Sequence, residues 1–230
     1  MSQTKSALII GASRGLGLGL VRQLRAEGWQ VTATVRDPQR ADELRALPGV
    51  VIAQVDIDDG EAVDALQQRL HDQVFDLLVV NAGISGPQHQ SVGAATQAEL
   101  GQLFMTNAVA PVRLAERFAM QVREGSGTVA FMSSILGSIA GNDSSYLALY
   151  KASKAALNCL SRGFHGEQEQ SERHLTVLSL HPGWVRTDMG GSEAPLDVPT
   201  SCSGLVQQIA LHGGSGKHLY IDYEGTPLPW

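Results

Sequence analysis

The residues best suited to chemistry in this sequence are a tyrosine and a lysine four positions apart, Tyr150 and Lys154. In a helix, residues with this spacing lie on one face, a turn apart. A free phenol titrates near pH 10 and is a poor acid–base catalyst at neutral pH. An ammonium group about 4 Å away favours the phenolate by about 4 kcal/mol at an effective dielectric constant of about 20, which is roughly three pKa units. The pair therefore predicts a general acid–base catalyst with a lowered pKa, and a surface pair without function is the alternative.

A glycine-rich stretch near the N-terminus predicts a phosphate-binding turn. It follows the apolar run Ala7–Ile10 and precedes a helical pattern over Leu16–Glu27. Glycines permit a tight turn and let backbone N–H groups reach a pyrophosphate at a helix N-terminus. The spacing Gly-x3-Gly-x-Gly differs from G-x-G-x-x-G, so the prediction depends on the strand–turn–helix context, and a turn without a ligand is the alternative. The residues of the turn are Gly11, Ser13, Arg14, Gly15, Leu16 and Gly17.

The end of the next apolar run, Gln30–Val35, predicts which dinucleotide is bound. An acidic side chain there holds a ribose 2′-hydroxyl, whereas a cation holds a 2′-phosphate. Arg36 follows the run directly, and Arg14 lies in the glycine turn. Two guanidinium groups suit a dianionic phosphate, so NADP (as NADPH) is favoured. Asp37 could pair with Arg36 or accept from a ribose hydroxyl, which keeps NAD as the less favoured alternative.

Short apolar runs alternate with longer segments of helical period, which is typical of the βα units of a parallel sheet. The expected strands are Ala7–Ile10, Gln30–Val35, Val50–Val55, Leu77–Val80, Thr128–Met132, Leu175–Leu180 and His218–Ile221. The expected helices are Leu16–Glu27, Pro38–Leu47, Gly60–His71, Thr96–Arg123, Tyr150–Glu172 and Val198–Leu211. We therefore expect a Rossmann-like, doubly wound α/β fold with a seven-stranded parallel sheet and helices on both faces, in one domain over residues 1–230.

The composition narrows the class of protein. Hydrophobic residues make up 43% of the chain and the net charge is -6, so we expect a globular protein that binds neither nucleic acid nor a membrane. The two cysteines lack CxxC spacing, and no His/Cys/Asp cluster has the spacing of a metal site. Apolar runs are too short for a signal peptide or a membrane span, so a cytoplasmic location is expected.

The sequence resembles the short-chain dehydrogenase/reductase family over nearly its whole length. The matching elements occur in the family's order: the glycine turn, Asp56-Ile57, Asn81-Ala82-Gly83, Asn107, Ser134, the Tyr150/Lys154 pair and His181-Pro182-Gly183-Trp184-Val185-Arg186-Thr187. The segment Ser133–Ser138 and the ending Tyr223–Trp230 are similar to the C-factor-like and sniffer-type carbonyl reductases.

The resemblance implies a role for each matching residue. Tyr150 would donate a proton to a carbonyl oxygen that Ser134 also holds. Lys154 would lower the pKa of the tyrosine and bind the nicotinamide ribose, and Asn107 would anchor a water that refills the proton through Lys154. Asp56 and Ile57 would cover the adenine, and Asn81, Ala82 and Gly83 would line the adenosine ribose. Pro182 and Gly183 would pass over the nicotinamide, Thr187 would bond its carboxamide or the pyrophosphate, and Val185 would also contact the cofactor.

Two departures from the family pattern affect these expectations. Ile10 stands before the first glycine where the family commonly has threonine, so a hydroxyl that braces the turn is missing. The interval between Ser134 and Tyr150 is slightly longer than usual, which leaves open whether Ser133 or Ser134 faces the substrate. We favour Ser134.

The function expected from these features is an NADPH-dependent carbonyl reductase, or the reverse alcohol dehydrogenase. The expected substrate pocket, formed by Ile84–Gln90, Ile135–Leu149, Trp184 and Met189–Leu196, is mostly apolar or small, and Arg186 is the nearby basic residue. A neutral aldehyde, ketone or quinone is therefore expected rather than an acid.

Two other functions stay open. One is an NADP-binding signalling or regulatory protein with little turnover, and the other is an epimerase or dehydratase of the extended family branch. The family also implies a homodimer or homotetramer, formed through the helices over Thr96–Arg123 and Tyr150–Glu172.

Overall fold

Seven strands form one parallel sheet in the computed structural model, which describes residues 4–230. The strands are β1 (Ser6–Ile10), β2 (Gln30–Val35), β3 (Val50–Gln54), β4 (Leu77–Val80), β5 (Thr128–Met132), β6 (Thr176–His181) and β7 (His218–Asp222). Their order across the sheet is β3-β2-β1-β4-β5-β6-β7. The expected parallel sheet is confirmed, with strand ends within one residue of the prediction. The order changes direction between β1 and β4, which places a crevice outside the carboxyl ends of these strands.

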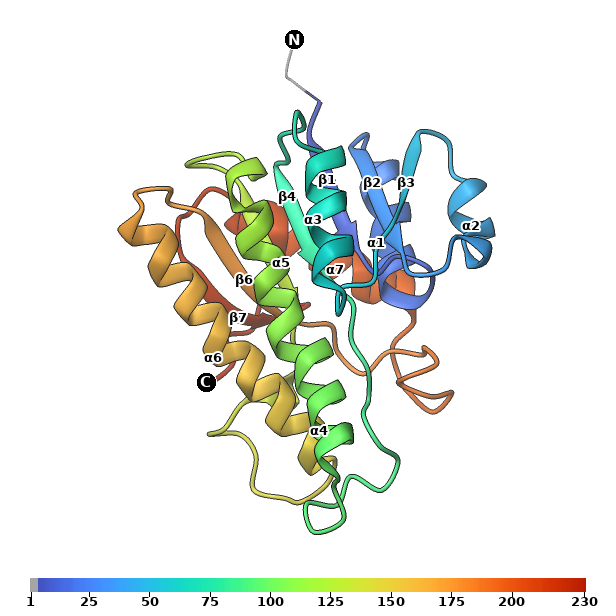
Figure 1. Cartoon of the computed structure of the whole chain (residues 1–230), viewed down its shortest axis with the longest axis vertical. Helices are drawn as coiled ribbons and strands as arrows, with labels where there is room; N and C mark the ends of the chain where they lie inside the picture. The colour runs from blue at the N-terminus through green and yellow to red at the C-terminus, as the bar shows by residue number, and fades with distance from the viewer. Residues whose placement is uncertain (1–3) are drawn as a thin grey trace.

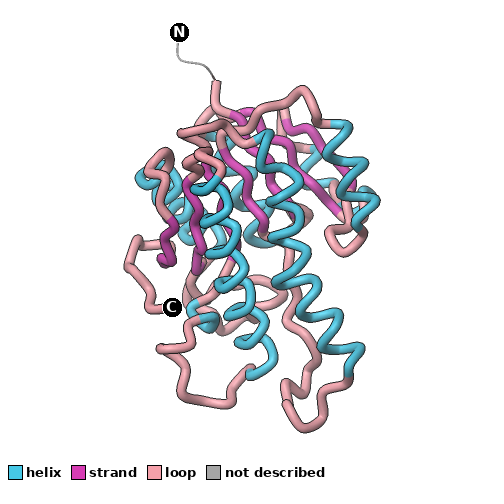
Figure 2. The backbone as a smooth tube through the Cα atoms, turned by 60° about the vertical axis from the view of Figure 1, so that its left-hand side comes forward, coloured by secondary structure: helices cyan, strands magenta, loops and turns pink. Residues whose placement is uncertain are grey.

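Helices cover both faces of the sheet (Figure 1). On one face lie α3 (Gly60–Arg69), α5 (Ala110–Phe118) and α6 (Ala148–Gln170), and on the other α1 (Gly15–Ala26) and α7 (Val198–His212). In Figure 2 the helices of the first face stand in front of the strands, and long loops gather at one end of the molecule. None of the helices within residues 4–230 has the length and apolar character needed to cross a bilayer.

The core has two parts, one on each face of the sheet. Successive side chains of a strand point to opposite faces, so Leu8 and Ile10 of β1 join one cluster while Ala7 and Ile9 join the other. The first cluster holds the largest buried side chains of α5 and α6, and the second holds those of α1 and α7. Continuous apolar strands are what such a doubly covered sheet requires.

Side-chain caps mark where several helices begin. The Asp59 side chain accepts from backbone N–H groups at the start of α3, and Asp197 does so at the start of α7. At the start of α4 (Gln97–Phe104), Thr96 and Glu99 form a reciprocal capping box. By contrast, α1 and α6 have no side-chain cap from the residue that precedes them.

The helix expected over Thr96–Arg123 is present as one helical path over residues 97–121, but its hydrogen bonding is not α-helical throughout. After α4 comes a π-helical turn, Met105–Val109, then α5 and a 3-10 turn, Ala119–Gln121. Proline lacks an N–H group, so Pro111 cannot donate to the carbonyl of Asn107 four residues earlier. The backbone N–H of Ala110 bonds to Met105 O, as a π turn requires.

The expected helix over Pro38–Leu47 is divided into a 3-10 turn (Pro38–Arg40) and the short α2 (Asp42–Arg45). The break falls at Ala41, whose φ of -112° lies outside the helical range. A further 3-10 turn, Ile135–Gly137, follows β5.

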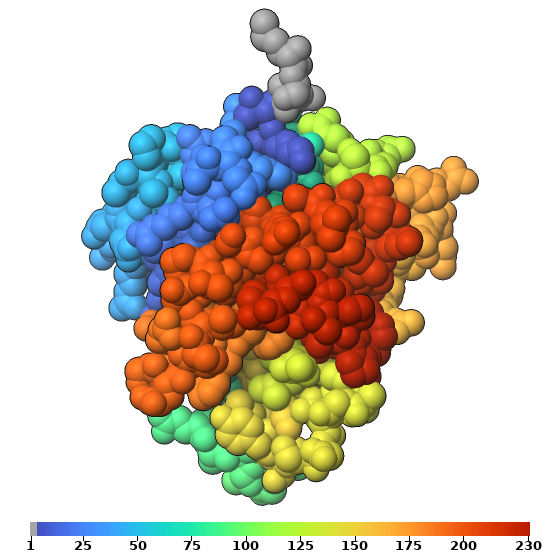
Figure 3. Space-filling model, turned by 180° about the vertical axis from the view of Figure 1, so that it is seen from behind, coloured from blue at the N-terminus to red at the C-terminus, as the bar shows by residue number. Residues whose placement is uncertain are grey.

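The C-terminal segment packs against the loop between β5 and α6. Figure 3 shows this segment next to that loop on the face covered by α7, and Ala140 N donates to Trp230 O at 3.1 Å. The Trp230 ring lies 5.0 Å from the ring of Tyr220, whose hydroxyl donates to the backbone oxygen of Ser134. The loop that carries Ser134 is therefore supported from β7.

Candidate active site

A cavity of about 600 Å³ opens at the carboxyl ends of the central strands, where the strand order changes direction. It is lined by residues from the ends of β1 to β5, the first turns of α1 and α6, and the loop after β6. The predicted site residues among its lining are Gly11, Ser13, Arg14, Gly15, Leu16, Arg36, Asp56, Ile57, Asn81, Ala82, Gly83, Tyr150, Lys154, Pro182 and Thr187. Gly17, Asn107, Ser134, Gly183 and Val185 are not part of this lining.

The glycine turn has the backbone shape that a bound phosphate needs. Gly11 and Gly15 have φ angles of 82° and 55°, which favour glycine. Gly11 N donates to Thr34 Oγ1 at 3.1 Å, and Asn81 Nδ2 donates to Gly11 O at 2.7 Å. Thr34 therefore provides the bracing hydroxyl that Ile10 cannot. Sequence reasoning missed this residue, since only the pairing of β1 with β2 brings it to the turn.

The N-terminus of α1 has room and charge for an anion. Arg14, the residue before the helix, makes no side-chain cap, and the first turn contains no acidic residue. The backbone N–H groups of this turn are thus not capped by a side chain, and the helix dipole favours negative charge here. The residues present fit the pyrophosphate of a dinucleotide.

Gly17 acts through packing rather than through the cavity. A Cβ atom there would lie 2.1 Å from Gly11 O and 2.8 Å from Asn81 Nδ2, both part of the glycine turn. We expect Gly17→Ala to lower the free energy of unfolding by about 2 kcal/mol and to weaken NADPH binding, because the turn must move.

The matched control for Gly17→Ala is Gly163→Ala in α6, where an added Cβ meets nothing within 4 Å. This change should raise the free energy of unfolding by up to about 1 kcal/mol, through helix propensity. Urea unfolding of both variants measures the difference. Equal stability of the two variants would contradict the close approach at Gly17.

The two arginines that sequence reasoning assigned to a 2′-phosphate both reach the cavity. Arg36 lies exposed at its edge, and no ion pair of Arg36 occurs within residues 4–230. Asp37, the alternative partner, instead accepts from Gln39 N at 2.9 Å and lies 3.6 Å from Arg40. Arg14 pairs with Asp188 at 2.5 Å, which joins the glycine turn to the loop after β6.

Tyr150 and Lys154 lie in the first two turns of α6. Lys154 is 4% exposed, and its Nζ donates to Met132 O at 2.8 Å. Nζ lies 5.8 Å from the centre of the Tyr150 ring. The Ser134 side chain lies near enough to the phenol to lower its pKa, against the effect of burial.

Burial disfavours the charged form of each group, and this shifts the pKa of the two groups in opposite directions. It raises the pKa of Tyr150 to about 12, which the Ser134 side chain offsets only in part. It lowers the pKa of Lys154 to about 8. The predicted lowering of the tyrosine pKa is therefore wrong for this arrangement, because the loss of solvent on burial outweighs the lowering by the Ser134 side chain.

The two serines after β5 point in different directions. Ser133 Oγ donates to Asn158 Oδ1 at 2.6 Å and is held in the interior. Ser134 Oγ accepts from Leu136 N at 3.2 Å, and the Ser134 side chain is the one that lowers the pKa of Tyr150.

Asn107 lies in the π-helical turn, fully buried behind the cavity. Its Oδ1 accepts from Ile84 N, and its Nδ2 donates to Ile84 O, both at 2.8 Å. Nδ2 also donates to Ser153 Oγ at 3.0 Å, and Ser153 Oγ donates to Tyr150 O at 2.7 Å. Sequence reasoning missed Ser153, although its place between Tyr150 and Lys154 was a signal.

The end of β3 adds a further missed residue, Asp58. Its Oδ2 accepts from Thr106 Oγ1 at 2.6 Å and from Gln102 Nε2 at 2.8 Å. Its other oxygen is buried without a partner within the described residues. Asp58 lines the cavity beside Asp56 and Ile57, so two acidic side chains stand at this end.

The loop after β6 folds back on itself. Val185 pairs with Leu196, and Arg186 donates to the carbonyls of Ala194 and Pro195, both at 2.8 Å. Thr187 Oγ1 accepts from Gly190 N at 3.1 Å. The guanidinium of Arg186 is thus already bound within the loop.

Within residues 4–230, no three His, Cys, Asp or Glu side chains come together as a metal site. Burial lowers the pKa of His181, at the end of β6, to about 4. His181 is therefore uncharged at neutral pH.

Comparison with known proteins agrees with the geometry. The short chain dehydrogenase family model matches residues 5–195. The chain is 37% identical over 156 residues to the C-signal of Myxococcus xanthus, covering 67% of this chain and 92% of that protein. A carbonyl reductase from Pseudomonas aeruginosa PAO1, solved in complex with NADP, is 42% identical with a TM-score of 0.91, covering 99% of this chain and all of that one. The carbonyl reductase Sniffer of D. melanogaster is 35% identical with a TM-score of 0.87, at the same coverage. The chain belongs to the short-chain dehydrogenase family of oxidoreductases.

Proposed function

We propose that this chain is an NADPH-dependent carbonyl reductase that acts on a neutral aldehyde, ketone or quinone, with Tyr150 as the general acid. The observation that carries the proposal is the placement of Tyr150 and buried Lys154, one helical turn apart, at the cavity that also holds the glycine turn, with the Ser134 side chain near the phenol. Similarity to carbonyl reductases, one of them solved with NADP, supports it.

The nicotinamide, when bound, supplies the hydride that reduces the carbonyl carbon. Tyr150 gives its proton to the carbonyl oxygen. The phenol is protonated at neutral pH, as a proton donor must be, and its proton passes to the strongly basic oxygen that develops as hydride reaches the carbonyl carbon. Ser134 Oγ, beside the phenol, donates to the same oxygen as negative charge develops. The ammonium of Lys154 stabilises the phenolate that remains.

Asn107 and Lys154 are proposed to return the proton to Tyr150 through a water that Asn107 anchors. A Cβ atom on Gly83 would lie 3.3 Å from Asn107 Oδ1 and 3.6 Å from Lys154 Nζ, so both polar atoms border the space above this glycine. Asn107 is fixed by three hydrogen bonds, which suits an anchor.

Arg36 is proposed to hold the 2′-phosphate of the cofactor. We expect Arg36→Ala to raise the KM for NADPH by about 10- to 100-fold, the effect of a lost charge-assisted hydrogen bond, with kcat/KM for NADH unchanged. The control is Arg40→Ala, which removes an exposed arginine that faces Asp37 outside the cavity. Steady-state kinetics with both cofactors measure the preference. An equal loss with NADH would show that Arg36 does not recognise the phosphate.

A neutral substrate is proposed because no free cation faces the expected pocket within the described residues. Arg186 is bound to two backbone carbonyls, and Lys151 Nζ donates to Ser144. We expect kcat/KM for a neutral ketone to exceed that for its keto-acid analogue by at least about tenfold, since nothing would offset the desolvation of the carboxylate. Chromatography should also find one alcohol formed per NADPH consumed, and preference for the keto acid would contradict the proposal.

The second candidate, an NADP-binding signalling or regulatory protein, is favoured by the similarity to the C-signal of Myxococcus xanthus. A protein that only binds the cofactor has no need for Ser134 beside Tyr150. Tight NADPH binding without consumption across a broad carbonyl panel would favour this candidate over the reductase.

A further inference from the structure

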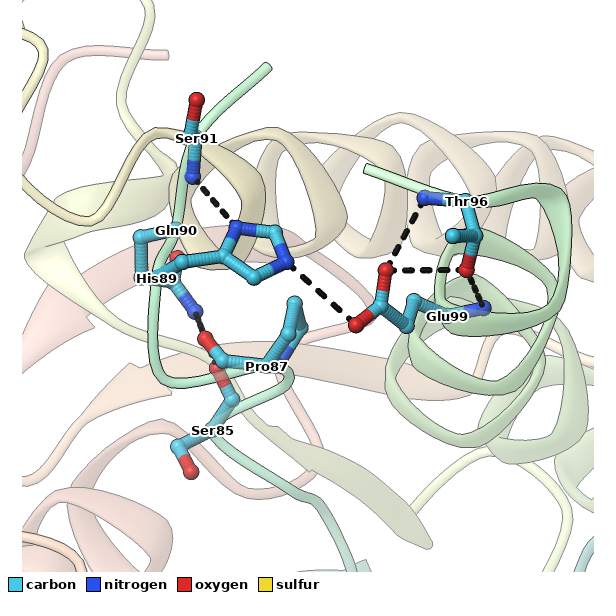
Figure 4. Close-up of polar contacts among 7 residues, drawn as sticks. All are labelled: Ser85, Pro87, His89, Gln90, Ser91, Thr96 and Glu99. Carbon is cyan, nitrogen blue, oxygen red and sulfur yellow. Dashed lines mark hydrogen bonds and ion pairs between the residues drawn. The ribbon is translucent and has the colours of Figure 1, made fainter. Parts of the chain in front are cut away.

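One side chain, Gln90, joins the loop after β4 to the start of α6. Gln90 Oε1 accepts from the backbone N–H of Tyr150 at 2.9 Å. Its Nε2 donates to the backbone oxygens of Ser85 and Pro87, both at 2.8 Å. Figure 4 shows the amide of Gln90 turned toward Pro87 within its own loop. All three polar contacts of this amide are therefore to backbone groups that it holds in place.

The start of α6 lacks a cap of its own. Leu147, the residue before the helix, has a left-handed backbone with φ of 51° and an apolar side chain that cannot accept a hydrogen bond. The first N–H groups of a helix have no acceptor within it, and Tyr150 carries the third of them. Gln90 provides the acceptor from another element, 60 positions away. Since Ser153 donates to Tyr150 O, the backbone of the tyrosine is held on both sides.

The loop that carries Gln90 is itself firmly held. Asn107 binds both backbone groups of Ile84 at one end. Beside Gln90, His89 Nδ1 accepts from Ser91 N at 2.9 Å and His89 Nε2 lies 3.3 Å from Glu99 Oε1, within the capping box of α4 (Figure 4). Because this loop is held at Ile84 and at His89, Gln90 can in turn hold the start of α6 in a fixed position.

The backbone of Gln90 is also unusual. Its φ of 48° lies in the left-handed region, which an ordinary side chain adopts at a cost of about 1–3 kcal/mol. Asparagine or glycine would adopt it more readily. This conformation directs a glutamine amide at the start of α6, a contact that neither of those shorter residues could make.

We propose that Gln90 is a positioning residue for Tyr150. Its Oε1 caps the start of α6 and so fixes the position and the orientation of the Tyr150 phenol. The inference rests on the proposed function, because it assigns Gln90 to the orientation of that general acid. Small displacements of a reacting group are enough to slow catalysis severely.

Two variants test separately the oxygen of the Gln90 amide, which accepts from Tyr150 N, and its nitrogen, which donates within the loop. Gln90→Met keeps the length of the side chain but neither accepts nor donates. Gln90→Glu keeps an oxygen for Tyr150 N–H, where the helix dipole favours a carboxylate, but cannot donate to Ser85 and Pro87. Gln68→Met, which replaces an exposed glutamine of α3 outside the cavity and the expected substrate pocket, is the matched control.

We expect Gln90→Met to lower kcat by about tenfold, with the KM for NADPH within twofold of the wild type. Gln90→Glu should stay within about threefold of the wild-type kcat, and Gln68→Met should not differ from it. If Gln90 served only to hold its own loop through Ser85 and Pro87, Gln90→Glu would be at least as slow as Gln90→Met. This result would overturn the proposal.

Hydrogen exchange provides a readout that does not depend on turnover. The amide of Tyr150 should exchange at least about tenfold faster in Gln90→Met than in the wild type or Gln90→Glu. Faster exchange with wild-type kcat would overturn the positioning role while the proposed function stands. Absence of carbonyl reduction by the wild type would overturn the proposed function, and the catalytic meaning of Gln90 with it, whatever the exchange rates.

Discussion

Replacing Tyr150 with phenylalanine is expected to lower kcat for carbonyl reduction by about 1000-fold, with NADPH affinity within a few-fold of the wild type. The substitution keeps the ring and its packing in the first turn of α6 and removes only the hydroxyl. That hydroxyl is the proton donor and the partner of Ser134 in the proposed mechanism. The loss should therefore fall on the chemical step, and steady-state kinetics with fluorescence titration of NADPH measure the two quantities.

Tyr146→Phe is the control for this substitution. Tyr146 lies four positions earlier, is 70% exposed and is not part of the cavity lining. Because Tyr146 belongs to the expected substrate pocket, the loss of its hydroxyl can change the KM for the carbonyl, but kcat should stay within about twofold of the wild type. If Tyr150→Phe retained wild-type turnover on a good substrate, a different group would have to donate the proton.

Lys154→Met is expected to lower kcat by about 100-fold and to remove a decline in kcat above about pH 8. The lowered pKa of Lys154 means that its ammonium loses its proton near pH 8. Below that pH the positive charge stabilises the phenolate that forms in the reaction, and above it this contribution is lost. With methionine the pH profile should be flat across this range.

The same substitution should stabilise the protein at neutral pH. The pKa of Lys154 is lower in the folded chain than the ordinary value of 10.5, so between about pH 8 and 10.5 the unfolded chain binds more protons and stability rises with pH. Below pH 8 the folded state bears the full cost of a buried charge. Removing it should raise Tm by a few degrees while activity falls, a known trade-off at active sites.

Lys217→Met is the control for these measurements, because Lys217 is an exposed lysine in the loop before β7. It should keep the decline near pH 8 and the wild-type Tm. Loss of the decline in this variant, or its persistence in Lys154→Met, would contradict the assignment of the titrating group.

The sheet could be predicted from the sequence because its strands are buried on both faces. Such strands are continuous apolar runs with sharp ends, as in β2, β4 and β5, whose bounds match the prediction residue for residue. The π-helical turn near Asn107 could not be predicted in the same way. Helical periodicity continues through a π turn, and the missing N–H of Pro111 shows its effect only once the backbone is in place.

The residues of the cavity that belong to local motifs could be predicted from the sequence. The residues that reach the site through contacts between distant segments could not. The glycine turn, Arg36 and the Tyr150/Lys154 pair all border it. Thr34, Ser153 and Gln90 act through contacts that depend on strand pairing or on the docking of a loop. The direction of the tyrosine pKa shift depends on burial, which a spacing of four residues does not encode.

The most direct test of the account is the loss of reduced-nicotinamide absorbance when the wild-type protein meets a panel of neutral aldehydes, ketones and quinones, with NADPH and NADH in parallel. We expect turnover of at least one class of carbonyl, with NADPH preferred over NADH. Binding of NADPH without consumption across the whole panel would contradict it.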